Sequence, residues 1–258
     1  MTDAYFEQHG EGRYLPTEHA SGAWNPGEIH FSPLGGLIVH ELERHRGGSD
    51  DKQLARVSFD ILGFLSLEEC VVEVETIRPG RTIELVEASV TIAGRRAVLA
   101  RAWYISPTDS SRAAGGAPPA LANPTALETK PVMQAWSGGY VASLDVRPIG
   151  TPTPGRTTAW LRTGVTLVAG QASAPVATFI MLVDTANGIA VRESPDEWVF
   201  PNLDLTIHLY RMPEPSWVGL DTTVTFGPTG LGLTSTALHD IRGAVGRSEQ
   251  VLTIRPPS

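Results

Sequence analysis

Apolar positions along the chain fall into two similar halves, each with one segment at helical spacing and several that alternate. Leu34, Leu37, Ile38 and Leu42 recur at intervals of three and four, which predicts a helix. Ser32 followed by Pro33 is typical of its start, and Gly47-Gly48 of its end. Alternating or β-branched segments, bounded by Gly and Pro, predict strands over 57–61, 70–77, 82–92 and 97–105.

The second half repeats this composition of elements. A helix is expected over 173–184, with Ser173 as N-cap, and strands over 140–147, 159–168, 205–209, 217–226, 232–239 and 248–254. Matching Ala97-Val98 to Ala244-Val245 sets an offset of 147 residues between the halves, which places Trp103 opposite Gln250. One copy would then carry an apolar plug where the other carries an amide, so we expect one active site per chain, built on the second copy.

A stretch rich in Pro, Ala, Gly and Ser over 106–133 divides the chain near its midpoint and is typical of a linker. Residues 1–26 are polar and are expected to be irregular. The prediction is an α+β fold of two tandem hotdog units, 1–105 and 134–258, each a curled antiparallel sheet around one helix. Edge strands require partners, so the two units are expected to pair edge to edge as an internal pseudo-dimer.

Two long blocks resemble the double-hotdog acyl-CoA thioesterases of the thioesterase II (TesB-like) type. They are VEVETIRPGRTIELVEASVTIAGRRAVLARAWY in the first half and NLDLTIHLYRMPEPSWVGLDTTVTF in the second, the latter followed by Gly232 and by Gln250 five residues before Arg255. The resemblance covers 22–105 and 134–255. It implies hydrolysis of acyl-CoA to a fatty acid and CoA without a metal or organic cofactor, in a homo-oligomer.

The resemblance also implies three site residues, an Asp, a Thr or Ser, and a Gln. They fall on Asp184, Asn202 and Gln250, and Asn202 departs from the family because it has no hydroxyl. Asp184 is unusual by itself, since it follows five apolar residues near the end of its predicted helix, where the helix dipole disfavours a carboxylate. It is expected to be a general base, and Gln250, on the face of Leu252 and Ile254, to hold the attacking water.

Gly35 and Gly36 fall in the first turn of the first predicted helix, where each costs roughly 1 kcal/mol relative to Ala. They serve either close packing or, as the family's paired glycines suggest, an oxyanion hole at a helix N-terminus. An acyl chain would then lie between the two helices. His30 precedes the helix and either lines the mouth of the site or is bonded to local backbone.

Composition narrows the classes of partner. The net charge is −8 and lysine occurs only at Lys52 and Lys130, so nucleic acid is not expected. No apolar run approaches the ~20 residues of a membrane span, and the N-terminus lacks the apolar core of a signal peptide. A single cysteine, Cys70, is expected in the core of a cytoplasmic protein. His40 and His45 are wrongly spaced for a metal site.

Two other functions stay open on the sequence. The Asn at position 202 leaves room for an acyl-CoA or lipid-binding protein without turnover. The segment from Asn25-Pro26 to His30 is superficially similar to the signature of a hotdog enoyl-CoA hydratase, but it lacks the preceding Asp and its His comes two positions late.

Overall fold

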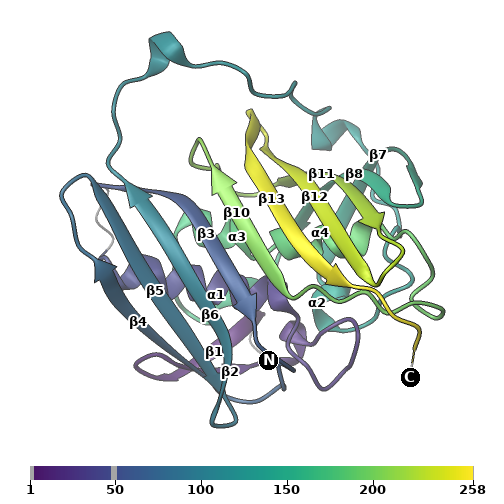
Figure 1. The fold of residues 1–258 in the computed structure, drawn as a ribbon, viewed down its shortest axis with the longest axis horizontal. Helices are drawn as coiled ribbons and strands as arrows, with labels where there is room; N and C mark the ends of the chain where they lie inside the picture. The colour runs from purple at the N-terminus through teal and green to yellow at the C-terminus, as the bar shows by residue number, and fades with distance from the viewer. Residues whose placement is uncertain (1–2, 48–50, 258) are drawn as a thin grey trace.

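A computed structural model describes residues 3–47 and 51–257, and in it one largely antiparallel sheet curls around two central helices, one long and one short (Figure 1). The strands follow the order β7-β8-β11-β12-β13-β10-β3-β6-β5-β4-β2-β1-β9, with only β1 and β9 parallel among the described pairs. The helices are α1 (Phe31–His45), α2 (Gly139–Ala142), α3 (Pro175–Ile180) and α4 (Ala186–Ile189). Short 3-10 turns are η1 (Glu18–Ala20), η2 (Ser111–Ala113), η3 (Pro124–Ala126) and η4 (Val183–Thr185).

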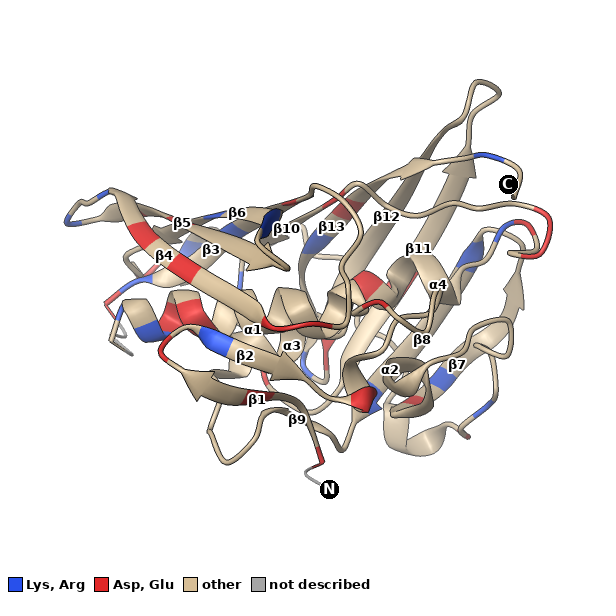
Figure 2. Cartoon of the chain, turned by 90° about the horizontal axis from the view of Figure 1, so that it is seen from below, with Lys and Arg blue, Asp and Glu red and all other residues tan. Residues whose placement is uncertain are grey.

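Each half contributes its own run of strands. The first supplies β1 (Ala4–Gly10), β2 (Arg13–Pro16), β3 (Gln53–Ile61), β4 (Cys70–Arg78), β5 (Ile83–Ile92) and β6 (Arg95–Ile105). The second supplies β7 (Leu144–Thr153), β8 (Arg156–Thr163), β9 (Thr166–Val168), β10 (Asp204–Leu209), β11 (Val218–Phe226), β12 (Leu231–Asp240) and β13 (Gly243–Thr253). Seen from below, the strands enclose α1 and α3, with β1, β2 and β9 on the far side of the helices from β3 and β6 (Figure 2). The predicted double hotdog is confirmed.

The two halves join where β10 pairs antiparallel with β3, centred on Thr206 opposite Ser58. The flanking pairs, Val57 with Ile207 and Phe59 with Leu205, turn four apolar side chains inward, and all four are at most 1% exposed. Val57 thus pairs with the counterpart of Phe59, and Phe59 pairs with the counterpart of Val57, if each residue is matched to the one 148 positions later. This exchange is what a pseudo-twofold axis through the central pair produces. This edge-to-edge pairing satisfies the backbone of two strands that would otherwise be open edges.

The same register corrects the predicted match between the halves. On its other side, Ser58 pairs with Arg101 of β6, and its counterpart Thr206 pairs with Glu249 of β13. Arg101 therefore corresponds to Glu249, and the residues that follow them, Ala102 and Gln250, correspond to each other. The offset of 147 that placed Trp103 opposite Gln250 is wrong by one residue. In a strand a slip of one residue moves a side chain to the opposite face of the sheet.

Two bulges support this correction. The ladder between β5 and β6 skips Ala97, and the ladder between β12 and β13 skips Val245, again 148 positions later. Ala102 is fully buried, whereas the side chain of Trp103 is only partly covered. The first copy therefore holds a small apolar residue, not a tryptophan, at the place where the second copy holds Gln250.

Helix α1 begins two residues before the predicted Pro33, because His30 rather than Ser32 is its N-cap. His30 Nδ1 accepts a hydrogen bond from the Ser32 amide at 3.1 Å. The helix ends at His45, and Gly47 adopts a left-handed φ of +68° as predicted for a stop; Gly48 lies outside the described residues. The N-terminal end of α1 contacts the second unit, where Ser32 Oγ lies 3.3 Å from Thr185 Oγ1.

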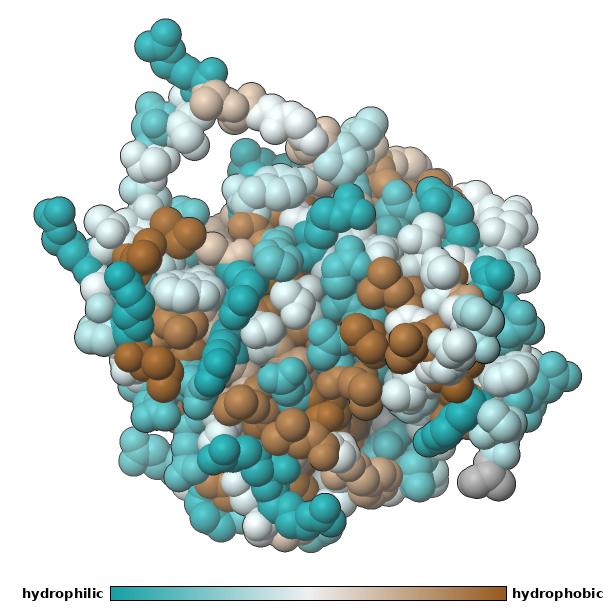
Figure 3. Space-filling model, in the orientation of Figure 1, coloured by the Kyte–Doolittle hydropathy of each residue, from teal (hydrophilic) through white to brown (hydrophobic). Residues whose placement is uncertain are grey.

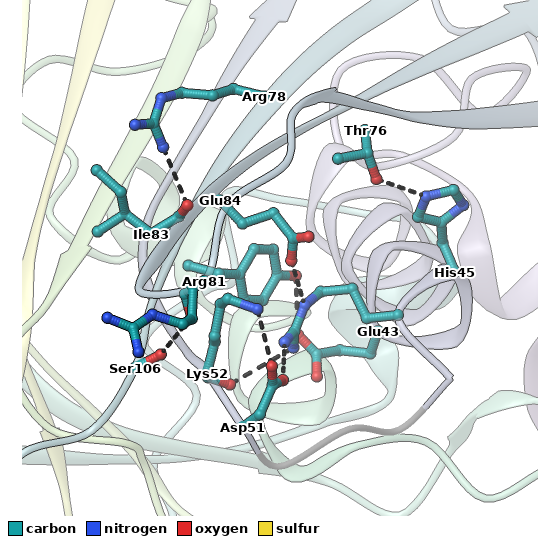
Figure 4. Close-up of polar contacts among 12 residues, drawn as sticks. Glu43, His45, Asp51, Lys52, Thr76, Arg78, Arg81, Ile83, Glu84 and Ser106 are labelled. Atoms are coloured by element: carbon teal, nitrogen blue, oxygen red, sulfur yellow. Dashed lines mark hydrogen bonds and ion pairs between the residues drawn. The ribbon is translucent and has the colours of Figure 1, made fainter.

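Polar contacts anchor the other end of α1 to the sheet (Figure 4). The Arg46 guanidinium donates to Glu84 at 3.1 Å and to Asp51 at 2.8 Å, and lies over the Tyr104 ring at 4.3 Å. Tyr104 in turn donates to Glu43 at 2.8 Å. Because the side chains of Arg46 and Glu84 are only 5% and 17% exposed, the contact between these two is shielded from solvent and holds the end of the helix against the sheet.

Four predicted elements differ from the structure. The single strand expected over 159–168 is divided into β8, which ends at Thr163, and β9, which pairs with β1 instead of continuing beside β7 and β11. The second helix, expected to run from Ser173 to Asp184, is capped by Ala174 without a side-chain bond and stops at Ile180, after which Asp184 lies in the separate turn η4. Residues 139–142 form a turn of helix, so the strand expected from 140 begins at Leu144. The segment 1–26, expected to be irregular, contains β1 and β2, whose Tyr5, Phe6 and Tyr14 are fully buried.

The outer face of the sheet is mixed in character (Figure 3). Charged and polar residues alternate there with exposed apolar ones, among them Ile83, Ile105, Leu233 and Val251. Cys70 is fully buried in β4, as expected, and His208 is exposed on β10. Within the described residues, no helix is long and apolar enough to cross a membrane.

Candidate active site

A cavity of about 480 Å³ opens between the two units. Its walls come from five loops and turns, 23–31, 61–65, 133–136, 184–188 and 199–203, together with Arg255. Three of the predicted site residues, His30, Asp184 and Asn202, share this wall. Gln250 lies behind it, and Gly35 and Gly36 are not part of it.

Asp184 is the central acidic group of the cavity. Its residue is 6% exposed, and its Oδ1 accepts two amide hydrogen bonds, from Asn202 Nδ2 and from Gln250 Nε2, each at 2.8 Å. Burial raises the pKa of Asp184 to about 7, although both amide bonds act to lower it. Desolvation therefore outweighs two charge-assisted hydrogen bonds, and the carboxyl titrates near neutrality.

The position of Asp184 relative to helix ends differs from the prediction. It does not lie in the last turn of a helix, and its Oδ2 is instead 3.7 Å from Nδ1 of His30, the N-cap of α1. The positive end of a helix dipole favours an anion there. The break after Ile180 turns the carboxylate toward that helix end.

His30 and Asp184 do not form an ion pair. His30 Nδ1 already accepts the Ser32 amide, so in this ring the proton is on Nε2. Burial lowers the pKa of His30 to about 3, which keeps the ring neutral. The ring stacks on Tyr140 with centroids 4.2 Å apart, and the Tyr140 hydroxyl is bonded to Thr185 at 2.6 Å. Both readings of His30 from the sequence thus hold together, because it bonds local backbone and lines the cavity.

Asn202 uses both hydrogens of its amide nitrogen, donating to Asp184 Oδ1 at 2.8 Å and to the Asp204 carbonyl at 3.0 Å. Its carbonyl oxygen accepts no hydrogen bond from the described residues and belongs to a side chain on the cavity wall. Asn202 can therefore offer an acceptor to a bound molecule while it holds the carboxylate.

Gln250 is fully buried in β13 and reaches Asp184 from behind the cavity wall. Its place on the face of Leu252, as the alternation predicted, is confirmed by their shared burial. The structure brings its amide to the carboxylate rather than to the cavity, so it positions Asp184.

Gly35 and Gly36 do not lie in the first turn of α1, where an oxyanion hole was expected. Because α1 begins at Phe31, the Gly35 and Gly36 amides lie beyond the first turn and donate within the helix. A Cβ on Gly36 would lie 2.4 Å from the Met181 Cβ, so Gly36 is needed for contact between α1 and α3. The same contact closes the space between these helices at this point, where the acyl chain had been expected.

One amide at the N-terminus of α1 stays available. His30 N donates to the Ala20 carbonyl at 2.8 Å, Ser32 N donates to His30, and Pro33 has no N–H. Among the described residues, the Phe31 N–H has no acceptor, and Phe31 lines the cavity. Sequence reasoning missed this amide because it placed the N-cap two residues too late.

Sequence reasoning also missed the apolar part of the wall. It includes Ile61, the last residue of β3, then Leu62, Phe64 and Leu65, which follow that strand, and also Met133 and Trp136, at and just after the end of the predicted linker. Leu62 and Phe64 are 54% and 60% exposed at the rim. The sequence did contain a signal for this wall, because the apolar residues of β3 continue past the end of the strand into 62–65. Among the described residues, no group of three or more potential metal ligands occurs.

Comparison with known proteins agrees with this geometry. A model of the acyl-CoA thioesterase N-terminal domain matches residues 20–105, and a model of the acyl-CoA thioesterase C-terminal domain matches residues 100–254. No curated protein sequence is significantly similar to the chain.

Solved structures share the fold at low sequence identity. A hot dog fold protein from Alicyclobacillus acidocaldarius aligns with a TM-score of 0.77 at 13% identity, over 99% of this chain and 98% of that one. The tesB protein of Mycobacterium avium subspecies paratuberculosis aligns with a TM-score of 0.70 at 15% identity, over 97% and 96%. The acyl-CoA thioesterase II TesB2 of Mycobacterium marinum aligns with a TM-score of 0.64 at 17% identity, over 98% and 96%.

The two domain models together span most of the chain and overlap within β6. The chain is therefore a thioester hydrolase with the double-hotdog fold, and it belongs to the acyl-CoA thioesterase family.

Proposed function

We propose that this protein hydrolyses acyl-CoA to a free fatty acid and CoA, with Asp184 as the general base. The observation that supports this most directly is the state of that carboxyl. It is buried on a cavity wall, it titrates at about 7, and two amides hold one of its oxygens while the other faces His30 and the cavity. A base with a pKa near neutrality is well matched to proton transfer from water.

The reaction would begin with a water that donates one hydrogen to Asp184 Oδ2 and the other to the Asn202 carbonyl oxygen. Asp184 takes the first proton as the water oxygen bonds to the thioester carbonyl carbon, and the carbonyl oxygen becomes an oxyanion. The C–S bond then breaks, the sulfur leaves as thiolate, and the proton held by Asp184 passes to that sulfur. Asn202 serves here in place of the family's hydroxyl residue, and Gln250 keeps Asp184 in position.

The oxyanion would be stabilised at the N-terminus of α1. Its donors would be the Phe31 N–H and the His30 Nε2–H, rather than the amides of Gly35 and Gly36. His30 is suited to this because its ring stays neutral and its tautomer is fixed by the Ser32 amide. Donors set in place before the reaction cost no reorganisation when charge develops.

We further propose that the protein acts as a homo-oligomer in the cytoplasm, within fatty acid metabolism. Exposed apolar side chains on the outer face of the sheet, such as Ile105 and Leu233, support an interface between copies. The unpaired, buried Cys70 is consistent with a reducing compartment. The division into units 1–105 and 134–258, with 106–133 as linker, remains our prediction.

Thiol release from a panel of acyl-CoAs of increasing chain length tests the proposal. Wild type should turn over at least one member, and Asp184→Asn should lose roughly a hundredfold or more of kcat. Asp109→Asn, which removes an exposed carboxylate from the linker, is the matched control. Full activity in Asp184→Asn would refute the assignment of the base, and binding without turnover by wild type would favour a non-catalytic acyl-CoA protein.

A further inference from the structure

The cavity that contains Asp184 also carries one cationic side chain, that of Arg255. Among the residues that line the cavity it is the only Lys or Arg, and the neighbouring His30 is neutral. The protein has a net charge of −8, so an unpaired cation at the cavity is not a consequence of a basic surface. A generally basic surface therefore does not explain the position of Arg255.

The backbone of Arg255 is held in place. It follows the end of β13 and forms an isolated antiparallel bridge with Val199, in which the Val199 amide donates to the Arg255 carbonyl at 2.8 Å and the Arg255 amide donates to the Val199 carbonyl at 3.1 Å. Val199 lines the cavity as well. The backbone that carries the guanidinium is thus fixed at the cavity wall, five residues after Gln250 in the sequence.

The side chain of Arg255 is exposed and has no acidic partner. No carboxylate of the described residues lies within 4.0 Å of it, and the hydrogen bonds of Arg255 with described residues are the two backbone bonds to Val199. The other charged residue at this rim, Glu28, accepts the amides of Trp24 at 3.2 Å and Asn25 at 3.1 Å, so its carboxylate is held by its own loop. Five N–H donors consequently face solvent at the mouth of the cavity.

Most apolar residues of the cavity wall lie on segments other than the one bridged to Arg255, namely 24–31, 61–65 and 133–136, and this larger apolar part suits an acyl chain. A thioester that reacts at Asp184 must leave its thiol half on the remaining side. A planar guanidinium presents paired donors that match two phosphate oxygens, and such charge-assisted bonds are stronger than neutral ones.

We propose that Arg255 binds a phosphate group of the thiol half of the substrate and so selects thioesters of phosphorylated pantetheine. This assignment rests on the proposed function, because it takes Asp184 as the place of the reacting carbonyl. CoA and 4′-phosphopantetheine share the chemistry that Arg255 recognises, and a series of leaving groups distinguishes them.

The test compares one acyl group on four thiols, CoA, 3′-dephospho-CoA, 4′-phosphopantetheine and pantetheine, in wild type and Arg255→Gln. The variant should raise KM for the phosphorylated thioesters by about tenfold with kcat unchanged, and should leave pantetheine thioesters unaffected. Each thiol of the series lacks a phosphate that the one before it carries. The first thiol for which wild type and Arg255→Gln have the same KM therefore shows which phosphate Arg255 binds. The KM advantage of wild type should shrink as salt is raised, because the contact is exposed.

Arg247→Gln is the matched control, since it removes the same charge from an exposed position on β13, the strand that Arg255 follows. An equal loss on all four thiols, or no loss on any, would overturn the proposal.

Failure of the proposed function would look different. Binding of free CoA and of pantetheine, measured by calorimetry on wild type and Arg255→Gln, does not depend on turnover. A wild-type protein that hydrolyses no thioester but binds CoA more tightly than Arg255→Gln does would refute the reaction and support the phosphate contact. Equal CoA affinity in the two proteins would refute the contact, whatever the activity.

Discussion

Replacing Asp184 with Asn should make the protein more stable while it removes activity. The carboxyl titrates at 3.8 in an unperturbed chain and at about 7 in the folded protein. Because a tenfold change in proton affinity corresponds to about 1.4 kcal/mol, keeping this group ionised in the fold costs about 4 kcal/mol. Asn carries no charge and is not subject to that cost.

The geometry indicates that Asn can take the same place. Its carbonyl oxygen can accept the two amide bonds, from Asn202 and Gln250, that Asp184 Oδ1 accepts now. Its amide nitrogen would replace Oδ2, which accepts no hydrogen bond from the described residues and lies 3.7 Å from His30 Nδ1. The substitution therefore removes charge without removing a partner.

The sign of the pH dependence follows from linkage. Between about pH 4 and pH 7 the folded state binds this proton while the unfolded chain has released it, so wild-type stability falls as pH rises through that window and then levels off. Asp184→Asn lacks this fall. Its advantage should be about 4 kcal/mol at about pH 8 and should narrow by roughly 2 to 3 kcal/mol at about pH 5.

Urea unfolding followed by tryptophan fluorescence at several pH values measures this difference, with Asp109→Asn as control for the loss of an exposed carboxylate. Equal unfolding free energies for wild type and Asp184→Asn at every pH would refute the reasoning, because the carboxylate would then be solvated in the fold.

Three further predictions concern the same region. The kcat/KM of wild type should rise with pH to a plateau, with an apparent pKa of about 7, since Asp184 must be ionised to accept a proton; a flat profile across neutrality would contradict this. Gln250→Leu should move that midpoint to higher pH, because the Gln250 bond lowers the pKa of Asp184, and an unchanged midpoint would show that the bond is not made. Gly36→Ala should lower the unfolding free energy by about 1 to 3 kcal/mol, because the new Cβ would overlap Met181. Gly35→Ala is the control and should be neutral or stabilising, because its Cβ meets only the edge of Phe31 at 3.4 Å. Equal urea midpoints for the two variants would argue against the α1–α3 contact.

Long, strongly patterned elements could be predicted from the sequence. The strands β3, β4, β5, β6 and β11 lie within a few residues of their expected bounds, because alternation in a half-buried strand is a local property. The short strands β1 and β2 were missed, since their burial against α1 depends on contacts distant in sequence, such as the hydrogen bond of Tyr14 to Glu41. The break after Ile180 was missed for the same reason, because five apolar residues in a row favour a continuous helix.

The sequence by itself determined the double-hotdog class and the residue types of the site, because hydrophobic period and local turns are encoded in neighbouring residues. Only the tertiary structure decided which of them meet. It showed that Asn202 and Gln250 share one oxygen of Asp184, and that His30 rather than Ser32 caps α1. The register of β10 against β3 made Ala102, not Trp103, the counterpart of Gln250. Register is set by pairing between strands far apart in the chain, and a difference of one residue exchanges the two faces of a strand.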